Sequence, residues 1–349
     1  MKLHLVGLPH TEMTDDYSWC AFTALAKTFA TMMSQQGFEV ITYGGPNSAI
    51  EGVENVPCHE APSSTDFFVP PWTQEYFHPM NERAIKAIRR RIEPGDLILL
   101  SMGVVQIPIA NAFPEHVSVE YCVGYGGSTA PAQVYPSEAW RHIILGHRAG
   151  EKQESVMTIQ GMSSHAVIPH FLDPLAFPKG DGDGDYVLFV GRLGSMKGEE
   201  VAAQAARLAG VPLKVVGAGD PPAGCEYLGT VGPKERAELM GNARAVMTPS
   251  LFPEPFCLVA IEAQMCGTPA ITTDWGAFTE TVEAGVSGFR CSTLNEFAAA
   301  IDTAPRLDRK AVRRRAKALY SMKAIGPQYT DFFNRLDAIY PDLMAVRGG

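Results

Sequence analysis

Short apolar segments alternate with longer segments of helical period along this chain, and the alternation runs through twice. Such alternation is typical of parallel β-sheets with helices on both faces. The first pass predicts strands at 2–7, 38–43, 96–101 and 117–122, with helices at 18–36 and 81–92. The second pass predicts strands at 186–191, 213–217, 227–229, 245–248 and 270–273, with helices at 198–209, 233–242, 258–266 and 294–303. We therefore expect an α/β protein with two Rossmann-like domains.

Prolines and glycines gather between residues 165 and 185, where we expect one domain to end and the next to begin. A length of 349 residues fits two domains, because single cores rarely grow beyond about 250–300 residues. The four consecutive apolar residues at 187–190 predict a strand that is covered on both faces, as in a parallel sheet. We place the domains at 1–168 and 169–320.

Cysteine usage and hydropathy exclude several classes of protein. The seven cysteines are odd in number and form no Cys-x-x-Cys pair, which argues against a disulfide scaffold or zinc ribbon and favours reduced thiols. Only Lys2 precedes the first apolar run, so we expect no signal peptide. The longest uncharged run, 97–113, is shorter than the ~20 apolar residues of a membrane span. We expect a cytoplasmic protein without a transmembrane segment.

Two short motifs resemble known ligand loops but lack essential residues. Gly217-Ala218-Gly219 follows a predicted strand, yet the chain continues into Asp220 and two prolines, so the third glycine of a dinucleotide fingerprint is missing. The Asp-Gly repeat at 181–185 lacks the glycine and the glutamate that a calcium-binding loop needs at its sixth and twelfth positions. We interpret the first as a tight turn and the second as a solvated linker.

A pair of cations marks the first candidate site. Arg192 and Lys197 lie in the loop between the strand that ends at Gly191 and the helix that begins near Gly198. Ligands of open α/β sheets bind at the carboxyl ends of strands, and a helix N-terminus with nearby cations favours an anion. The residues alone leave two readings open: a phosphate site, or two surface cations on a loop.

Two carboxylates mark the second candidate site. Glu254 lies just before the predicted helix 258–266, and Glu262 lies inside it among apolar residues. A carboxylate in apolar surroundings is costly unless it has partners. A carboxylate of this kind can accept hydrogen bonds from the two hydroxyl groups of a ribose. It could equally cap a neighbouring loop, and the residues alone do not decide between these roles.

These two segments together resemble glycosyltransferase family 4. The resemblance rests on Phe-Val-Gly-Arg-Leu-x-x-x-Lys-Gly at 189–198 and on two glutamates with seven residues between them, followed by Ala-Gln-Met-Cys-Gly-Thr-Pro at 263–269. The segments 274–280 and 286–289 match further loops of this family. The resemblance implies the GT-B fold, with two Rossmann-like domains whose parallel sheets face across an interdomain cleft. It also implies a retaining hexosyltransferase that uses a nucleotide diphosphate sugar, with a UDP-sugar expected.

The resemblance assigns a role to each candidate residue. Arg192 and Lys197 would hold the donor diphosphate beside Gly191, Glu254 would bond the transferred sugar, and Glu262 would bond the ribose. The remaining expected donor contacts are the base, at Thr230 and Val231, and the backbone N–H groups of Phe256, Cys257 and Leu258. Cys257 stands where the family most often has glycine, so its backbone conformation decides how closely the donor approaches.

The N-terminal half resembles, through segments 7–12 and 120–127, glycosyltransferases of this type encoded by actinobacteriophages. Gly7 and His10, which follow the first strand, are the candidates there for contact with donor or acceptor. An alternative for His10 is a merely exposed loop histidine. Further acceptor-side candidates are Glu120, Tyr121 and Tyr125, with Trp72, Phe77 and Trp140 as possible groove aromatics.

The segment 306–323 has eight basic residues and one acid in a chain of net charge −9. Arg309, Lys310, Arg313, Arg314 and Lys317 recur at helical spacing, which predicts either a surface that faces phosphates, as in DNA, or a membrane, or a solvated helix paired with acids elsewhere. The segment 321–349 resembles the family's C-terminal helix that crosses back to the first domain.

Four expectations about the reaction follow. The acceptor is an unidentified hydroxyl, with a hydroxymethylated pyrimidine of phage DNA and a virion or envelope glycan as candidates. No cofactor or metal is expected, because no Asp-x-Asp motif follows a predicted strand. A phage-encoded enzyme would act in the host cytoplasm. A UDP-sugar epimerase of the same fold and an inactive sugar-nucleotide-binding module remain alternatives.

Overall fold

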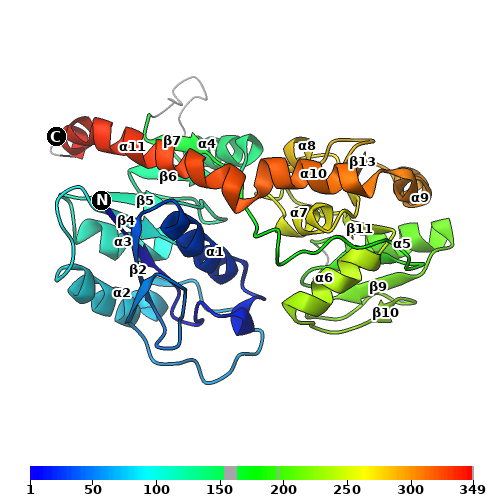
Figure 1. Ribbon diagram of the computed structural model, residues 1–349, viewed down its shortest axis with the longest axis horizontal. Coiled ribbons are helices and arrows are strands. Elements are labelled where there is room, and N and C mark those ends of the chain that lie inside the picture. Colours follow the sequence, from blue (N-terminus) through cyan, green and yellow to red (C-terminus); the bar gives the residue numbers. More distant parts are fainter. Residues whose placement is uncertain (153–162, 195, 348–349) are drawn as a thin grey trace. The chain divides into compact units, whose positions relative to one another are not determined.

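The computed structural model describes residues 1–152, 163–194 and 196–347, and the chain divides into two compact units (Figure 1). The first unit contains Met1–Pro136, Arg141–Phe171 and Ile325–Gly349, and the second contains Ser137–Trp140 and Leu172–Ala324. Each unit is built on one parallel β-sheet, which confirms the prediction of two Rossmann-like domains. The units divide after residues 171 and 324, beside the predicted divisions after 168 and 320.

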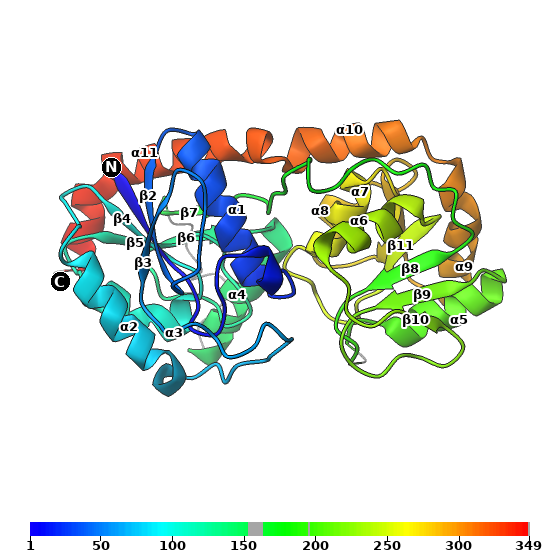
Figure 2. The same cartoon turned by 60° about the horizontal axis from the view of Figure 1, so that its bottom comes forward.

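The sheet of the first unit has seven parallel strands in the order β3-β2-β1-β4-β5-β6-β7. The strands are β1 (Lys2–Val6), β2 (Glu39–Gly44), β3 (Glu54–Pro57), β4 (Leu97–Leu100), β5 (Val117–Glu120), β6 (Ala132–Tyr135) and β7 (His165–Val167). Its helices are α1 (Ala21–Gln35), α2 (Gln74–Ile88), α3 (Gly103–Asn111), most of α4 (Glu138–Glu151) and most of α11 (Met322–Arg347). Figure 2 shows α1 and α11 on one side of this sheet and α2 and α3 on the other.

The sheet of the second unit has six parallel strands in the order β10-β9-β8-β11-β12-β13. The strands are β8 (Val187–Val190), β9 (Leu213–Val216), β10 (Glu226–Tyr227), β11 (Ala245–Thr248), β12 (Ala270–Thr273) and β13 (Gly288–Cys291). The helices are α5 (Glu199–Ala209), α6 (Pro233–Asn242), α7 (Leu258–Met265), α8 (Phe278–Thr281), α9 (Leu294–Thr303) and α10 (Arg309–Tyr320).

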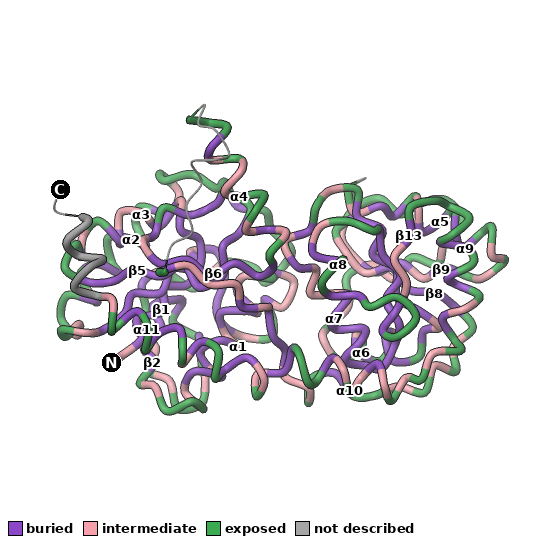
Figure 3. The backbone as a smooth tube through the Cα atoms, turned by 90° about the horizontal axis from the view of Figure 1, so that it is seen from above, coloured by how far each residue is buried: buried purple, intermediate pink, exposed green. Residues whose placement is uncertain are grey.

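Strand β8 shows how the second sheet is covered on both faces. Val187 and Phe189 lie in one apolar cluster with residues of α5 and α9, whereas Leu188 lies in another with residues of α6 and α7. Figure 3 shows β1 and β8, which are central strands of the two sheets, mostly in the colour of buried residues. The prediction of a doubly covered strand at 187–190 is therefore confirmed, because successive side chains of a strand point to opposite faces.

Several element boundaries differ from the predictions. Helix α2 spans Gln74–Ile88 rather than 81–92: Thr73 caps it by accepting from the Tyr76 N–H, and Pro79 lies within it. The strands β3, β6, β7 and β13 were not predicted; each is only three or four residues long. Among the residues that the structure describes, no helix combines the length and the apolar character needed to cross a membrane.

Candidate functional site

The site in the second unit lies at the carboxyl ends of the strands, where the strand order of its sheet reverses. Strand β8 lies between β9 and β11, so the chain winds outward from it to both sides. The loops that follow β8 and β11 therefore diverge from adjacent strand ends, which is where open α/β sheets bind ligands. Arg192 and Lys197 belong to the first of these loops and Glu254 to the second.

The loop after β8 is held close to its neighbours by backbone contacts. Its first residue, Gly191, donates its N–H to the carbonyl oxygen of Val216 at 3.0 Å. Gly198 begins α5 with φ at 77°, and a Cβ there would stand 2.0 Å from the carbonyl oxygen of Pro249. Glycine is therefore required at 198 by both conformation and space. The loop presents the exposed side chain of Arg192 and the half-buried one of Lys197.

Lys197 and Glu254 form the centre of the site. Nζ of Lys197 donates to Oε1 of Glu254 at 2.6 Å, and the hydroxyl of Ser250 donates to the same oxygen at 2.7 Å. The Glu254 side chain is only 3% exposed, whereas that of Lys197 is 28% exposed. Nζ of Lys197 also lies 4.8 Å from the centroid of the Phe252 ring. The pair thus presents a cation at the surface, held in place by a buried carboxylate.

Helix α7 begins beside Glu254 with an unusual backbone. Its N-cap, Cys257, has φ at 66° and ψ at 81°, and is the one non-glycine residue with positive φ in the described parts of the chain. The sequence raised the question of whether a side chain at 257 permits the glycine-like conformation, and here the cysteine adopts it. The first N–H groups of α7, among them that of Leu258, have no acceptor within the helix. Phe256 is buried, with its ring centroid 5.6 Å from that of Tyr320.

Glu262, one turn into α7, has a partner that the sequence analysis missed. Nη2 of Arg236, on α6, lies 3.3 Å from Oε1 of Glu262, while Oε2 of Glu262 and Nε of Arg236 are buried without a hydrogen-bond partner. One carboxylate oxygen is therefore held and the other remains an unused acceptor. The only sequence signal for Arg236 was a cation at the start of the helix that follows Thr230 and Val231. Thr230 is exposed, and Val231 packs against the apolar cluster of α6 and α7.

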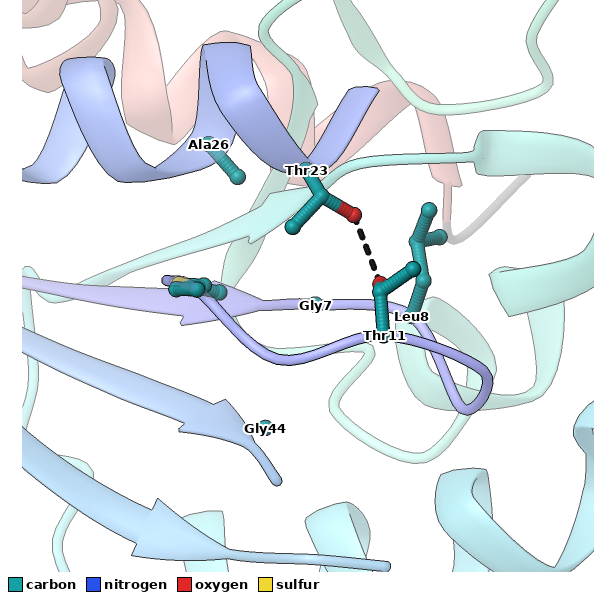
Figure 4. A pocket seen from close by; sticks show the side chains of 7 residues that line it. Gly7, Leu8, Thr11, Thr23, Ala26 and Gly44 are labelled. Carbon is teal, nitrogen blue, oxygen red and sulfur yellow. Dashed lines mark hydrogen bonds between the residues drawn. The ribbon is translucent and has the colours of Figure 1, made fainter. Parts of the chain in front are cut away.

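The two remaining predicted residues, Gly7 and His10, belong to the first unit. Gly7 follows β1, and a Cβ there would stand 2.8 Å from Cε of Met13. Figure 4 shows Gly7 beside a small hollow that Thr11 and Thr23 close with a 2.6 Å hydrogen bond between their hydroxyls. The hollow does not admit a water molecule. Close packing of the loop after β1 thus accounts for the glycine at position 7.

His10 is buried among aromatic rings. Its side chain is 7% exposed, and Nδ1 has no hydrogen-bond partner. Burial, with His59 nearby, lowers the pKa of His10 to about 4, so the imidazole is neutral at pH 7. The alternative of an exposed loop histidine is therefore wrong. Among the other acceptor-side candidates Phe77 and Tyr121 are buried, whereas Trp72 and Tyr125 are exposed.

Glu120 ends β5 as a fully buried carboxylate. Neither oxygen makes a hydrogen bond of ordinary geometry, and Oε2 occupies the space that a Cβ at Gly103 would need. Burial raises the pKa of Glu120 to about 7, an effect that Ser128 and the N–H groups of Gly103 and Gly124 offset only in part. Burial therefore favours the protonated form of this carboxyl group.

The basic segment 306–323 is less of a surface than its composition indicates. Arg309 donates to the carbonyl oxygens of Gly180 and Ala243, and Arg313 donates to the carbonyl oxygen of Pro174. Arg315 pairs with Glu283 at 2.9 Å. These three arginines fasten α10 to the second unit, so the prediction that Arg309 and Arg313 share an exposed face with Lys310 is wrong. The exposed cations are Arg306, Lys310, Arg314, Lys317 and Lys323.

Among the described residues, no group of three or more His, Cys, Asp or Glu side chains could hold a metal ion. The donor set of the site in the second unit is instead one of cations, backbone N–H groups and two glutamates. Such a set suits a ligand with both phosphate and hydroxyl groups.

Comparison with known proteins finds similarity concentrated in the second unit. Residues 176–319 match the family model described as Glycosyl transferases group 1. Two curated relatives are the D-inositol 3-phosphate glycosyltransferases of Rhodococcus erythropolis, 32% identical over 127 residues, and of Mycobacterium marinum, 33% identical over 140 residues. The matches cover 29% and 33% of this chain but only 28% and 29% of the relatives, less than a third of their length.

The fold of the whole chain is shared with solved glycosyltransferase structures. AviGT4, a glycosyltransferase involved in avilamycin A biosynthesis, is 20% identical with a TM-score of 0.69, covering 97% of this chain and 98% of that one. The Anabaena protein HepE, solved with UDP and glucose, is 15% identical with a TM-score of 0.66, covering 96% and 99%. Sucrose-phosphate synthase from Thermosynechococcus elongatus is 19% identical with a TM-score of 0.69, covering 97% and 99%. The fold is therefore that of the GT-B glycosyltransferases.

Proposed function

We propose that this protein is a retaining glycosyltransferase that moves a hexose from a UDP-sugar to an acceptor hydroxyl. The observation that carries the proposal is the Lys197–Glu254 pair. This pair lies at the strand ends where the strand order of the second sheet reverses. The match of residues 176–319 to group 1 glycosyl transferases supports the reaction class. UDP is proposed as the nucleotide because the similarly folded Anabaena protein was solved with UDP and glucose.

In this proposal the diphosphate lies against Arg192, Lys197 and the first N–H groups of α7. The bond between the anomeric carbon and the diphosphate breaks, so negative charge grows on the phosphate oxygen and positive charge grows on the sugar. The two cations gain interaction as that charge develops, which is the condition for accelerating the reaction. The acceptor oxygen bonds the anomeric carbon on the face that the phosphate leaves, and the leaving phosphate oxygen takes the acceptor proton.

Two glutamates bind the two sugar rings of the donor. Glu254 accepts from hydroxyls of the transferred sugar while its other oxygen holds Lys197. Oε2 of Glu262, which is buried and unpartnered, accepts from the ribose hydroxyls. Thr230 and Val231 meet the base on the loop before α6, and Gly191 lets the diphosphate approach β8. His10 and Gly7, in the first unit, are proposed on the acceptor side. No step requires a metal ion.

The test is a donor screen that measures nucleotide release. Purified protein is incubated with UDP-, GDP- and ADP-sugars, with EDTA present or absent, and with acceptors that include simple glycosides and hydroxymethylated DNA. We expect UDP release that EDTA leaves unchanged and a product with the anomeric configuration of the donor. Conversion of UDP-GlcNAc without an acceptor would identify an epimerase instead. Calorimetric UDP-sugar binding with no turnover on any acceptor or water would identify an inactive binding module.

A further inference from the structure

An exposed group of aromatic side chains covers His10 in the first unit. Phe67, Phe68 and Trp72 are 39%, 48% and 42% exposed. The ring centroid of His10 lies 5.6 Å from that of Trp72 and 6.2 Å from that of Phe68, both edge to face. Together with Trp19, whose ring contacts both His10 and Phe67, these residues form what we call the aromatic cluster. Large exposed apolar side chains gathered in one place mark a binding surface.

Two buried imidazole nitrogens accompany the aromatic cluster. Nδ1 of His10 and Nε2 of His59 are both buried without a hydrogen-bond partner. Burial is the chief cause that lowers the pKa of each ring, and His59 lowers the pKa of His10 further, so both imidazoles are neutral at pH 7. Buried polar atoms in proteins are normally hydrogen-bonded. The unpartnered Nδ1 of His10, which contacts the exposed aromatic rings, and the second unpartnered nitrogen on His59 indicate a ligand that brings its own hydrogen-bonding groups.

The position of the cluster also favours a ligand. His10 follows β1, which lies between β2 and β4 where the strand order of the first sheet reverses. That strand end is the place where an open α/β sheet binds ligands. The segment that carries the exposed rings is anchored there, since Nε1 of Trp19 donates to the carbonyl oxygen of Thr65 at 2.8 Å.

Charge limits what the ligand can be. The segment 58–76 contains three acids, Glu60, Asp66 and Glu75, and neither lysine nor arginine. Arg83, which acts electrostatically on His59, is paired with Glu60 at 3.4 Å. With both imidazoles neutral, the aromatic cluster itself has no cation for a phosphate or a sulfate. Nucleic acids depend on cations for most of their affinity, so a DNA acceptor is disfavoured at this surface.

We propose that the aromatic cluster binds an uncharged saccharide, and that this saccharide is the acceptor. The proposal rests on the glycosyltransferase activity proposed above and names its acceptor class. The apolar C–H face of a pyranose lies against Trp72 and Phe68, and its hydroxyl groups satisfy His10 and His59. An aromatic face combined with a few directed polar atoms is the usual construction of a site for small polar ligands.

The experiment probes saccharide binding separately from turnover. The full-length protein is applied to an array of neutral oligosaccharides, sulfated and sialylated oligosaccharides, and hydroxymethylated DNA duplexes. The tightest ligand is then titrated against the wild type, Trp72→Ala, Phe68→Ala and the control Leu175→Ala. Leu175 is 89% exposed and belongs to the second unit. Circular dichroism and UDP affinity verify that each variant is folded.

We expect a neutral oligosaccharide as the tightest ligand, with affinity at least tenfold lower in Trp72→Ala and Phe68→Ala and unchanged in Leu175→Ala. The same saccharide should raise UDP release by the wild type. Preference for sulfated glycans or DNA, binding of no arrayed ligand, or equal affinity in the folded Trp72→Ala and Phe68→Ala variants would overturn the inference. UDP release alongside such a result leaves the proposed reaction standing. Saccharide binding without UDP release on any acceptor would overturn both the reaction and the acceptor role, and would leave only a saccharide-binding site.

Discussion

Lys197 donates to Glu254 at 2.6 Å and thereby ties the loop after β8 to the loop after β11. The contact leaves the cation 28% exposed and the carboxylate 3% exposed. A lysine held in this way keeps its charge where a phosphate can reach it, because its own counter-ion is buried beneath it. The pair is therefore the point at which the site is most sensitive to a single substitution.

Replacing Lys197 with alanine should lower kcat for UDP release by about 10²–10³, the usual effect of removing one electrostatic stabiliser. The matched control is Lys214→Ala, because Lys214 also pairs with a glutamate, Glu226, at 3.3 Å and is 24% exposed. Lys214 lies on β9, away from the loop that carries Lys197. Turnover that falls equally in both variants would contradict the special role of Lys197.

Arg236 should act as a positioning residue for Glu262. With Arg236→Gln, Oε1 of Glu262 loses its partner, and we expect affinity for UDP to fall about tenfold with kcat nearly unchanged. Arg236→Lys should restore part of the loss. Calorimetry with UDP and 2′-deoxy-UDP provides the discriminating readout, since wild type should prefer the ribonucleotide and Arg236→Gln should lose that preference. The control is Arg244→Gln, which breaks an exposed pair with Asp185.

Cys257 should prefer replacement by glycine to replacement by valine. Its φ of 66° is costly for any residue with a Cβ, by about 1–2 kcal/mol. Cys257→Gly should therefore be as stable as wild type or up to about 1 kcal/mol more stable, while β-branched Cys257→Val should lose at least about 1 kcal/mol. Chemical denaturation measures both. Cys225→Gly, at a position of negative φ, should be destabilised, and a stable Cys257→Val would refute the argument.

Glu120 should make stability depend on pH. Its pKa rises from 4.5 to about 7 in the folded state, so folding favours the protonated form. The contribution is fully present below pH 4.5 and is lost as pH rises through about 7, which corresponds to about 3 kcal/mol. Glu120→Gln should therefore gain stability relative to wild type between pH 5 and 8. Unfolding curves whose difference does not change with pH would exclude this account.

Gly103 should be intolerant of a side chain because of Glu120. A Cβ at position 103 would lie 1.9 Å from Oε2 of Glu120. We expect Gly103→Ala to lose at least about 2 kcal/mol, and Gly103→Ala combined with Glu120→Ala to lose less than the two single changes added together. Gly146→Ala is the control: Gly146 lies within α4 with open space around it, so alanine should stabilise the helix by about 1 kcal/mol.

Local patterns predicted the architecture because they report burial. The apolar run at 187–190 revealed a strand covered on both faces, and the structure buries its alternate residues in two clusters. The same reasoning missed β3, whose residues Glu54–Pro57 are exposed or half-buried and lie at the edge of the sheet. An edge strand needs no apolar run, so its sequence carries little signal.

Local patterns did not predict which way a long basic side chain turns, because its charged end can lie either in solvent or against backbone carbonyl groups. Helical spacing placed Arg309 and Arg313 on one basic face with Lys310, but the two arginines reach backbone carbonyls of the second unit. A long cationic side chain can lie along a helix surface and turn its charged end inward when carbonyl oxygens are available. The availability of those oxygens depends on chain segments more than 100 residues away, such as Gly180.

The amino-acid sequence by itself determined that this chain forms two parallel sheets and that charged residues follow the central strands of the second one. Both facts follow from the period of apolar residues and from the order of short motifs, which are local properties. Only the tertiary structure decided that Arg236 pairs with Glu262, that Lys197 donates to Glu254, and that the rings of Phe68 and Trp72 pack against His10. Such partnerships depend on which strands lie side by side, and strand order is set by packing of the whole sheet rather than by any one segment.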